Sequence, residues 1–304
     1  MTWELFAVFL GSTIRLATPL LLAGIGEMVS ERAGVLNMSI EGMMLMAAFA
    51  AAIGSWATGD PLLGLLIGIV AVQPIALLQA MLSNTLRANQ IVSGIGINIL
   101  MLGATTLAYR EIFGARSRTE IPGLAKIKPP LLGDIPVLGA AFEQVWLLYG
   151  SILLIVGTGL VLRYTSIGIM IHAAGAEPKA VDKSGLSVTR IRYGCVLFAG
   201  FMSSLAGAFL SIGDVHTFTE GMTRGAGYLA IVAVIFGKWR FGGTILASLL
   251  FGAATAAQFQ LPALGINIPN ALLIMLPYVL ALLAVGGLVG RQTAPAALGE
   301  PYRR

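Results

Sequence analysis

Long apolar segments alternate with short polar segments along the whole of this 304-residue chain. A helix needs roughly 20 mostly apolar residues to cross a bilayer, and most of the segments approach that length. Segment 228–237 is too short to cross as a straight helix. The apolar segments are 5–25, 39–56, 62–82, 91–108, 145–162, 193–212, 228–237, 244–259 and 268–289.

This pattern predicts an all-α, polytopic integral membrane protein of about eight to ten transmembrane helices, with discontinuous or re-entrant segments among them. Composition agrees, because 57% of the residues are hydrophobic and only 11% are charged. So few polar side chains cannot cover the surface of a soluble protein of this size. We expect residues 1–290 to form a single transmembrane domain and residues 291–304 to form a cytoplasmic tail.

Basic residues are dispersed between the apolar segments, although the net charge is +5. Dispersed charge does not build a nucleic-acid-binding face, so no nucleic acid is expected as a partner. Segment 163–192 holds more basic than acidic residues, and the positive-inside bias predicts that it is cytoplasmic. Counting spans backward from it places segment 111–144 outside. The side of the N-terminus stays open.

The segment 24–42 is unusually polar for a stretch between two apolar segments. One interpretation makes it an interfacial or cytoplasmic loop whose charges stay in water. The other makes it a broken or re-entrant helix that lines a cavity, with Arg32 paired to Glu31 or Glu41, because charges at bilayer depth face the protein interior and pair. Under the second interpretation the translocation-pathway residues are Glu27, Arg32, Asn37, Glu41 and Asn98.

Two further observations favour a lined pathway. Segment 223–238 is also interrupted by glycines and too short to span, and paired interrupted segments in two halves of a transporter mark a substrate route. Asn98 lies within the predicted span 91–108, where its amide must find hydrogen-bond partners inside the protein.

The sequence lacks motifs for ATP hydrolysis and for metal binding. The Gly237-Lys238 dipeptide is followed by Trp239, so the chain has no phosphate-binding P-loop there and cannot use ATP alone. Cys195 is the single cysteine, and His172 and His216 are predicted on opposite faces of the membrane. We therefore expect no enzyme activity, no metal and no cofactor bound by this chain.

Three strings resemble the integral-membrane permease subunits of bacterial ATP-binding-cassette importers, in the branched-chain amino acid and simple-sugar permease superfamily. The first is ATPLLLAGIGEMVSERAGVLNMSIEGMMLMAA at 17–48. The second is AAGAEPKAVDKSGLSVTRIRYGCVLFAGFMSSLAGAF at 173–209, and the third is EGMTRGAGYLAIVAVIFGKW at 220–239. The ERAGVLN and EGMM strings resemble most closely the subfamily for nucleoside uptake, which works with basic-membrane-lipoprotein binding proteins.

The resemblance implies roles for particular residues. Segment 173–190 corresponds to the cytoplasmic coupling segment that docks on the ATPase, and the first string to the family's intramembrane turn. Val181-Asp182-Lys183 and Phe241-Gly242-Gly243 depart from the family pattern, which weakens any inference about the matching ATPase or ligand. The coupling residues are Gly175, Glu177, Ala180 and Gly185, and the turn residues are Glu27, Arg32, Asn37 and Glu41.

The resemblance also implies a function and partners. It implies a multi-pass permease subunit in the bacterial inner membrane that translocates nucleosides or nucleobases by alternating access, with simple sugars as the alternative ligand. The implied partners are ATP-binding-cassette ATPase subunits that bind the ATP, a second identical or homologous permease subunit, an extracytoplasmic solute-binding protein and the lipid bilayer.

Two other classes of function stay open. An ion-coupled secondary transporter would use Glu27, Glu31 and Glu41 as proton or cation sites. A structural or assembly factor of the membrane would show no substrate-dependent signal. For the coupling segment we also expect Gly185 to end a short helix in the left-handed conformation.

Overall fold

The computed structural model describes residues 3–114, 119–130, 139–263, 269–283, 286 and 294–302. Helices make up nearly all of this part of the chain, and its one sheet is a pair of two-residue antiparallel strands. The elements are α1 (Trp3–Arg32), α2 (Ile40–Thr58), α3 (Pro61–Ala80), η1 (Met81–Thr85), α4 (Gln90–Phe113), β1 (Lys126–Ile127), η2 (Gly139–Phe142), β2 (Gln144–Val145), α5 (Trp146–Tyr164), α6 (Ser166–Ala176), α7 (Pro178–Lys183), α8 (Val188–Ala208), η3 (Phe209–Val215), α9 (Ala226–Phe236), α10 (Phe241–Ala263) and α11 (Asn270–Leu283).

Seven of the described helices are long and apolar enough to cross a membrane. They are α1, α2, α3 with η1, α4, α5, α8 with η3, and α10. The shorter apolar helices are α6, α9 and α11. The protein is therefore an all-α, multi-pass membrane protein, as the apolar segments predict. The expectation that segment 228–237 is too short to span is confirmed, because α9 has 11 residues.

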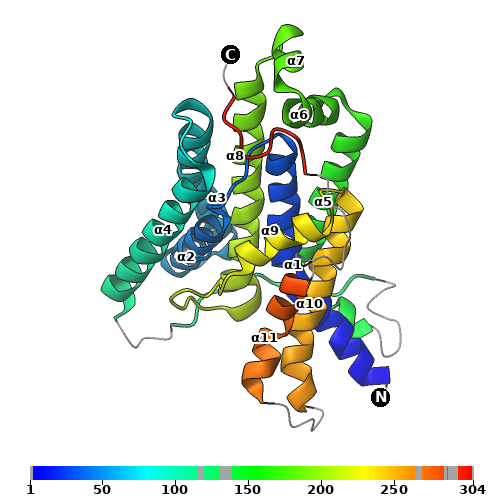
Figure 1. Ribbon diagram of the computed structural model, residues 1–304. Coiled ribbons are helices and arrows are strands. Elements are labelled where there is room, and N and C mark those ends of the chain that lie inside the picture. Colours follow the sequence, from blue (N-terminus) through cyan, green and yellow to red (C-terminus); the bar gives the residue numbers. More distant parts are fainter. Residues whose placement is uncertain are drawn as a thin grey trace.

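Helices α1, α2 and α8 form the centre of the bundle (Figure 1). Helix α2 packs against α3 and α8, and α1 packs against α8, α9 and α10. Helices α4 and α5 lie at the periphery and leave large apolar side chains such as Val92 and Leu153 exposed, as expected where lipid covers the surface. The predicted coupling segment, with α7, projects from one end of the bundle, and α11 lies toward the other end (Figure 1).

Helix α1 extends beyond the apolar segment 5–25, so the helix is not broken at the start of segment 24–42. It continues without a break to Arg32. Its glycines serve close packing instead of a turn: a β-carbon at Gly26 would lie 2.7 Å from Cβ of Met202 and 3.1 Å from Cα of Ala199, both on α8. The turn is confined to residues 33–39. Small residues at helix contacts are the usual means by which membrane helices approach closely.

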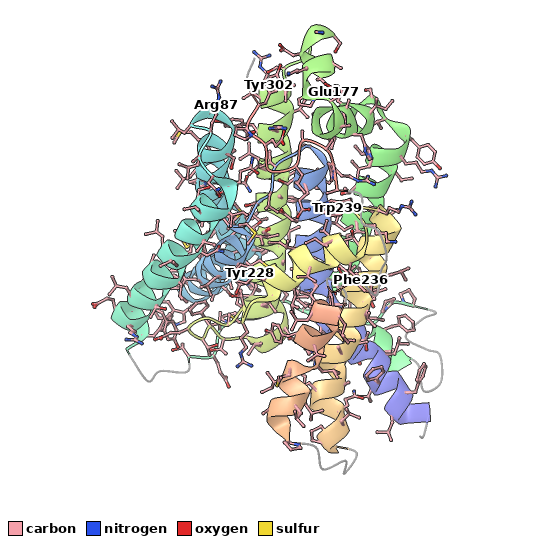
Figure 2. The ribbon with its side chains drawn as sticks, viewed as in Figure 1. Arg87, Glu177, Tyr228, Phe236, Trp239 and Tyr302 are labelled. Carbon is pink, nitrogen blue, oxygen red and sulfur yellow. The ribbon has the colours of Figure 1, made fainter. Side chains whose placement is uncertain are left out.

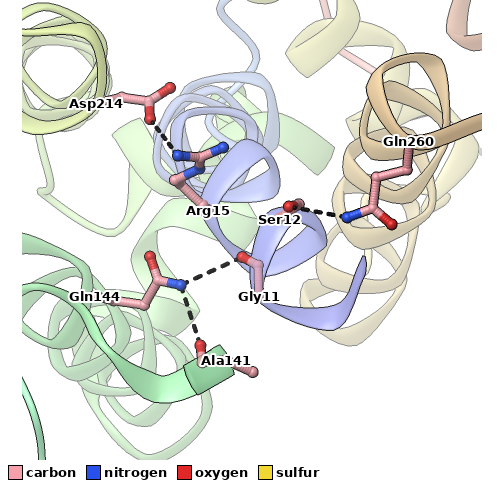
Figure 3. Close-up of polar contacts among 7 residues, drawn as sticks. All are labelled: Gly11, Ser12, Arg15, Ala141, Gln144, Asp214 and Gln260. Atoms are coloured by element: carbon pink, nitrogen blue, oxygen red, sulfur yellow. Dashed lines mark hydrogen bonds and ion pairs between the residues drawn. The ribbon is translucent and has the colours of Figure 1, made fainter. Parts of the chain in front are cut away.

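Polar contacts fix the first half of α1 to its neighbours (Figure 3). Arg15 Nη1 lies 3.3 Å from Oδ1 of Asp214, in η3. Gln260 Nε2, on α10, donates to Ser12 Oγ at 3.3 Å. Charged and polar groups inside a membrane bundle usually pair in this way, because an unpaired one is costly.

Candidate translocation and coupling site

Glu27 holds the chain that follows α1. It is completely buried, and its Oε1 accepts a hydrogen bond from the backbone N–H of Asn37 at 2.8 Å. Asn37 is also completely buried, and its Oδ1 accepts a hydrogen bond from Ser39 Oγ at 2.6 Å. The bond to Glu27 satisfies a backbone N–H of an irregular segment that has no hydrogen-bond ladder of its own, and the bond from Ser39 satisfies the Asn37 side chain. The interpretation of 24–42 as a loop whose charges stay in water is therefore wrong for Glu27.

Glu31 and Arg32 connect the end of α1 to the turn between α9 and α10. The indole N–H of Trp239 donates to Oε2 of Glu31, which is completely buried. Arg32 Nε donates to the backbone carbonyl of Trp239 at 2.7 Å. Adjacent residues on a helix do not face each other, so Glu31 and Arg32 reach one residue from different sides. Within the described residues Arg32 forms no ion pair, and the predicted pairing with Glu31 or Glu41 is wrong.

Glu41 closes the N-terminus of α9. Its Oε1 accepts hydrogen bonds from Thr223 Oγ1 at 2.6 Å and from the Gly225 N–H at 2.8 Å. Its Oε2 accepts one from the Gly227 N–H at 2.7 Å. The first N–H groups of a helix lack partners within it, and the helix dipole favours a negative charge there. Glu41 therefore attaches the start of α2 to the start of α9, and Gly227 has no room for a β-carbon because that atom would lie 2.7 Å from Glu41 Cα.

Asn98 joins α4 to both interrupted segments. Its Nδ2 donates to the carbonyl of Met38 at 2.8 Å and to the hydroxyl of Tyr228 at 2.8 Å. Its Oδ1 accepts the N–H of Gly42 at 2.8 Å. The prediction that this amide must find partners inside the protein is confirmed.

Residues 33–42 run back into the bundle along α4. The N–H of Leu36 donates to Gln90 Oε1 at the start of α4, and the N–H of Gly42 reaches Asn98 farther along the same helix. Eight residues of α-helix correspond to about 12 Å. The non-helical residues 33–39 therefore lie mostly buried in protein beside α4 before α2 begins at Ile40.

Arg110 forms a second link between α4 and the chain that precedes α9. Its Nε and Nη2 donate to Oε1 and Oε2 of Glu220 at 2.7 and 2.9 Å. This two-bond geometry is the strong form of an arginine–carboxylate contact. The hydrogen bond from Arg110 lowers the pKa of the Glu220 carboxyl below its ordinary value.

The predicted coupling segment contains a short helix, α7, at the end of the bundle where Figure 2 labels Glu177. Helix α7 begins with Pro178 at its first position. Gly185 follows the helix with φ of 86°, and Leu186 N–H donates to Val181 O at 3.3 Å. Together with the bond from Gly185 N–H to Asp182 O this is a Schellman motif, and the predicted left-handed conformation of Gly185 is confirmed. Ala180 is exposed.

Gly175 lies against the end of α1. A β-carbon there would lie 2.0 Å from the carbonyl oxygen of Arg32, so side chains larger than hydrogen are excluded. The carbonyl of Gly175 accepts the N–H of Ala297, in the C-terminal tail, at 2.9 Å. The base of the coupling segment therefore contacts both α1 and the tail.

Arg192, at the beginning of α8, completes this junction. Its side chain is buried, its Nε donates to Ala33 O at 3.0 Å, and its Nη1 donates to Glu300 O at 2.9 Å. The N–H of Gly299 donates to Gly34 O at 3.2 Å. The tail is thus fastened across the turn that follows α1, close to Tyr302 in Figure 2.

Sequence reasoning did not find Arg192, Trp239 or the tail as parts of this site. Trp239 was visible only as the end of the third string. Arg192 was counted with the cytoplasmic charges, although its position beside a long apolar segment is the signal of a basic side chain that enters the bundle. The tail offers no pattern of its own, because its contacts are made mainly by backbone groups.

Residues from all three strings meet in these contacts, and comparison with known proteins shows the family to which the chain belongs. The family described as branched-chain amino acid transport system, permease component, matches residues 9–285. The chain belongs to this permease family. No solved structure matches it significantly.

Curated relatives of this permease cover nearly its whole length. It is 36% identical to the guanosine ABC transporter permease protein NupQ of Bacillus subtilis, over 98% of this chain and 97% of the relative. It is 32% identical to the nucleoside ABC transporter permease protein NupC of Lactococcus lactis, over 94% and 93% of the two chains. It is 35% identical to the putative glucose ABC transporter permease protein TsgC13 of Haloferax volcanii, over 87% and 81%.

Proposed function

We propose that this permease is the membrane subunit of an ATP-binding-cassette importer that takes up nucleosides or nucleobases. Two relatives that match over more than nine-tenths of both chains are named for guanosine and nucleoside transport, which supports this ligand class. A relative named for glucose supports simple sugars as the second candidate. The observation that carries the proposal is the junction at Gly175, because it joins a projecting coupling helix directly to the end of α1.

The partners follow from this assignment. Two ATPase subunits bind and hydrolyse the ATP, and α7 with Glu177, Ala180 and Gly185 docks on them. A second permease subunit, identical or homologous, completes the translocation path. An extracytoplasmic binding protein delivers the ligand to the outer mouth, which includes segment 111–144. The complex lies in a bacterial inner membrane with the coupling segment and the tail on the cytoplasmic side.

We infer that force passes from the coupling segment to the pathway by contact. Movement of α7 displaces Gly175, which lies against the carbonyl of Arg32. Arg32 and Glu31 hold Trp239 at one end of α9, and Glu41 holds the other end. Helix α9 is therefore held at both ends by residues of the first string. Glu27, Asn37 and Asn98 keep the intervening chain in place. No covalent step is required of the permease.

Reconstitution tests this proposal. The permease, its second permease subunit, its ATPase subunits and its binding protein are incorporated into proteoliposomes, and uptake of labelled guanosine and of labelled glucose is measured. We expect guanosine uptake to require ATP, to stop when the ATPase is inactivated by substitution of its P-loop lysine, and to persist with a protonophore. Uptake of glucose alone would replace the nucleoside assignment with the sugar one.

One structural observation favours an ion-coupled secondary transporter as the second candidate function. Glu27 Oε2 and Glu31 Oε1 are buried and accept no hydrogen bond from the described residues. Buried acids of this kind serve as proton or cation sites in other carriers. Loss of guanosine uptake with the protonophore, with no effect of ATPase inactivation, would establish this mechanism in place of the ATP-driven one.

A further inference from the structure

A cavity of about 490 Å³ lies beside α9, on the side away from the coupling segment. It is lined by α1, η3, α9, α10, α11 and the chain that precedes α9, and Figure 1 shows α10 and α11 next to each other below α9. Thr223, which donates to Glu41, is part of its wall. The series of contacts that starts where Gly175 meets Arg32, and continues along α9 to Glu41 and Thr223, therefore reaches this cavity.

The wall of the cavity is mostly apolar and carries two aromatic side chains. Phe259 of α10 is 59% exposed and Tyr278 of α11 is 42% exposed. Large aromatic side chains that line a cavity and stay this exposed provide a surface on which a flat aromatic ligand can stack. Stacking of a nucleobase on an aromatic side chain is favourable and tolerates every base, because each base has a π-face.

Few polar groups of the wall are free to bind a ligand. The hydroxyl of Tyr278 donates to Arg224 O at 2.7 Å, and that of Thr255 donates to Phe251 O at 2.9 Å. The amide of Gln258 makes no hydrogen bond to the described part of the chain, and it lines the cavity next to Phe259. One amide offers one acceptor and two donors, which matches the polar edge of a base.

Arg224 is the single charged residue among the described residues that line the cavity. Its backbone has φ of 46°, a conformation that residues other than glycine rarely adopt, and Tyr278 fixes its carbonyl. The wall contains no carboxylate to bind a cationic ligand.

We propose that this cavity receives the nucleoside during translocation, with the base against Phe259 and Tyr278 and its polar edge on Gln258. The proposal rests on the assignment of nucleosides as the ligand class. It also separates the roles of residues: Glu41, Asn98 and their neighbours hold α9, whereas α10 and α11 contact the ligand.

The test compares Gln258→Leu and Phe259→Leu with Gln260→Leu in the complete complex in proteoliposomes. Gln260 lies about 200° around α10 from Gln258, and its amide bonds Ser12 instead of lining the cavity. We expect each of the two cavity variants to raise the KM for guanosine uptake by about 5-fold or more. The Gln260→Leu variant should keep the wild-type KM.

A second measurement uses Phe259→Cys, which a maleimide reagent should label more slowly when the complex is saturated with guanosine and at an unchanged rate with glucose. The native Cys195 is buried and provides little background. Wild-type KM values in both cavity variants, together with unprotected labelling, would overturn the cavity as the ligand site while leaving nucleoside transport standing. A wild-type complex that transports no nucleoside would overturn both.

Discussion

At the scale of single residues, the buried Glu27 and Glu31 and the partly buried Glu41 bind backbone and indole N–H groups. Glu27 holds Asn37, Glu31 holds Trp239, and Glu41 holds Gly225 and Gly227. Each acid joins segments that are far apart in the chain or fixes an irregular turn. Loss of such an acceptor leaves its buried donors unsatisfied, which costs stability.

Replacement of Glu41 by glutamine tests the largest of these contacts. Glu41→Gln removes the charge at the N-terminus of α9 and one of the two acceptor oxygens. We expect the permease to lose about 1–3 kcal/mol of stability, measured by thermal unfolding in detergent, and to lose guanosine uptake.

The matched control is Glu111→Gln, because Glu111 is exposed at the end of α4. A substitution there should change stability by less than about 0.5 kcal/mol. Equal unfolding temperatures for the two variants, with wild-type uptake in both, would show that Glu41 does not hold α9.

At the scale of elements, the coupling helix depends on its ending. Helix α7 has six residues and is closed by the left-handed Gly185. A helix this short has little stability of its own, so its orientation is set by its terminal motif and by the contact of Gly175 with α1. Helix α9 is similarly short and is fixed at both ends by contacts with α1 and α2.

Gly185→Val should misplace α7, because a β-branched residue is strongly disfavoured at this φ. We expect normal membrane insertion, weaker co-purification with the ATPase subunits and a lower ratio of guanosine taken up to ATP hydrolysed. Gly103→Val on α4 is the control, since a β-carbon at Gly103 meets nothing within 4 Å. If the Gly185 variant keeps the wild-type ratio, α7 is not the coupling helix.

At the scale of the whole molecule, the C-terminal tail fastens the coupling segment to the bundle. Three of its backbone groups bond Gly175, Gly34 and Arg192, so it spans the turn after α1 and the start of α8. A segment without secondary structure is ordered here by other parts of the protein. Its removal frees a buried arginine from one partner, which is costly for a charged group.

Truncation after residue 293 should therefore impair the coupling of ATP hydrolysis to transport more than it impairs insertion of the permease into the membrane. We expect the truncated permease to reach the membrane, to unfold at a lower temperature and to hydrolyse more ATP per guanosine transported. Removal of residues 303–304 alone serves as the control and should change neither quantity. A full truncation that transports and unfolds like wild type would show that the tail does not support the coupling segment.

The sequence by itself determined the membrane location, the all-α class, the short interrupted segment before Trp239 and the left-handed glycine after α7. These features depend on apolar length and on local backbone conformation, which neighbouring residues settle. The sequence also indicated that Asn98 needs partners inside the protein, and one of its two interpretations of segment 24–42 placed Glu27 and Asn37 there.

Only the tertiary structure decided what those partners are. The glycines at 24–26 suggested a break, yet α1 continues because α8 packs against them. Arg32 was expected to pair with an acid, but a carbonyl more than 200 residues away in the chain lies closer. The cavity between α9, α10 and α11 has no sequence pattern, since it forms where several helices diverge. Contacts between distant segments depend on how whole helices pack, which spacing along the chain does not encode.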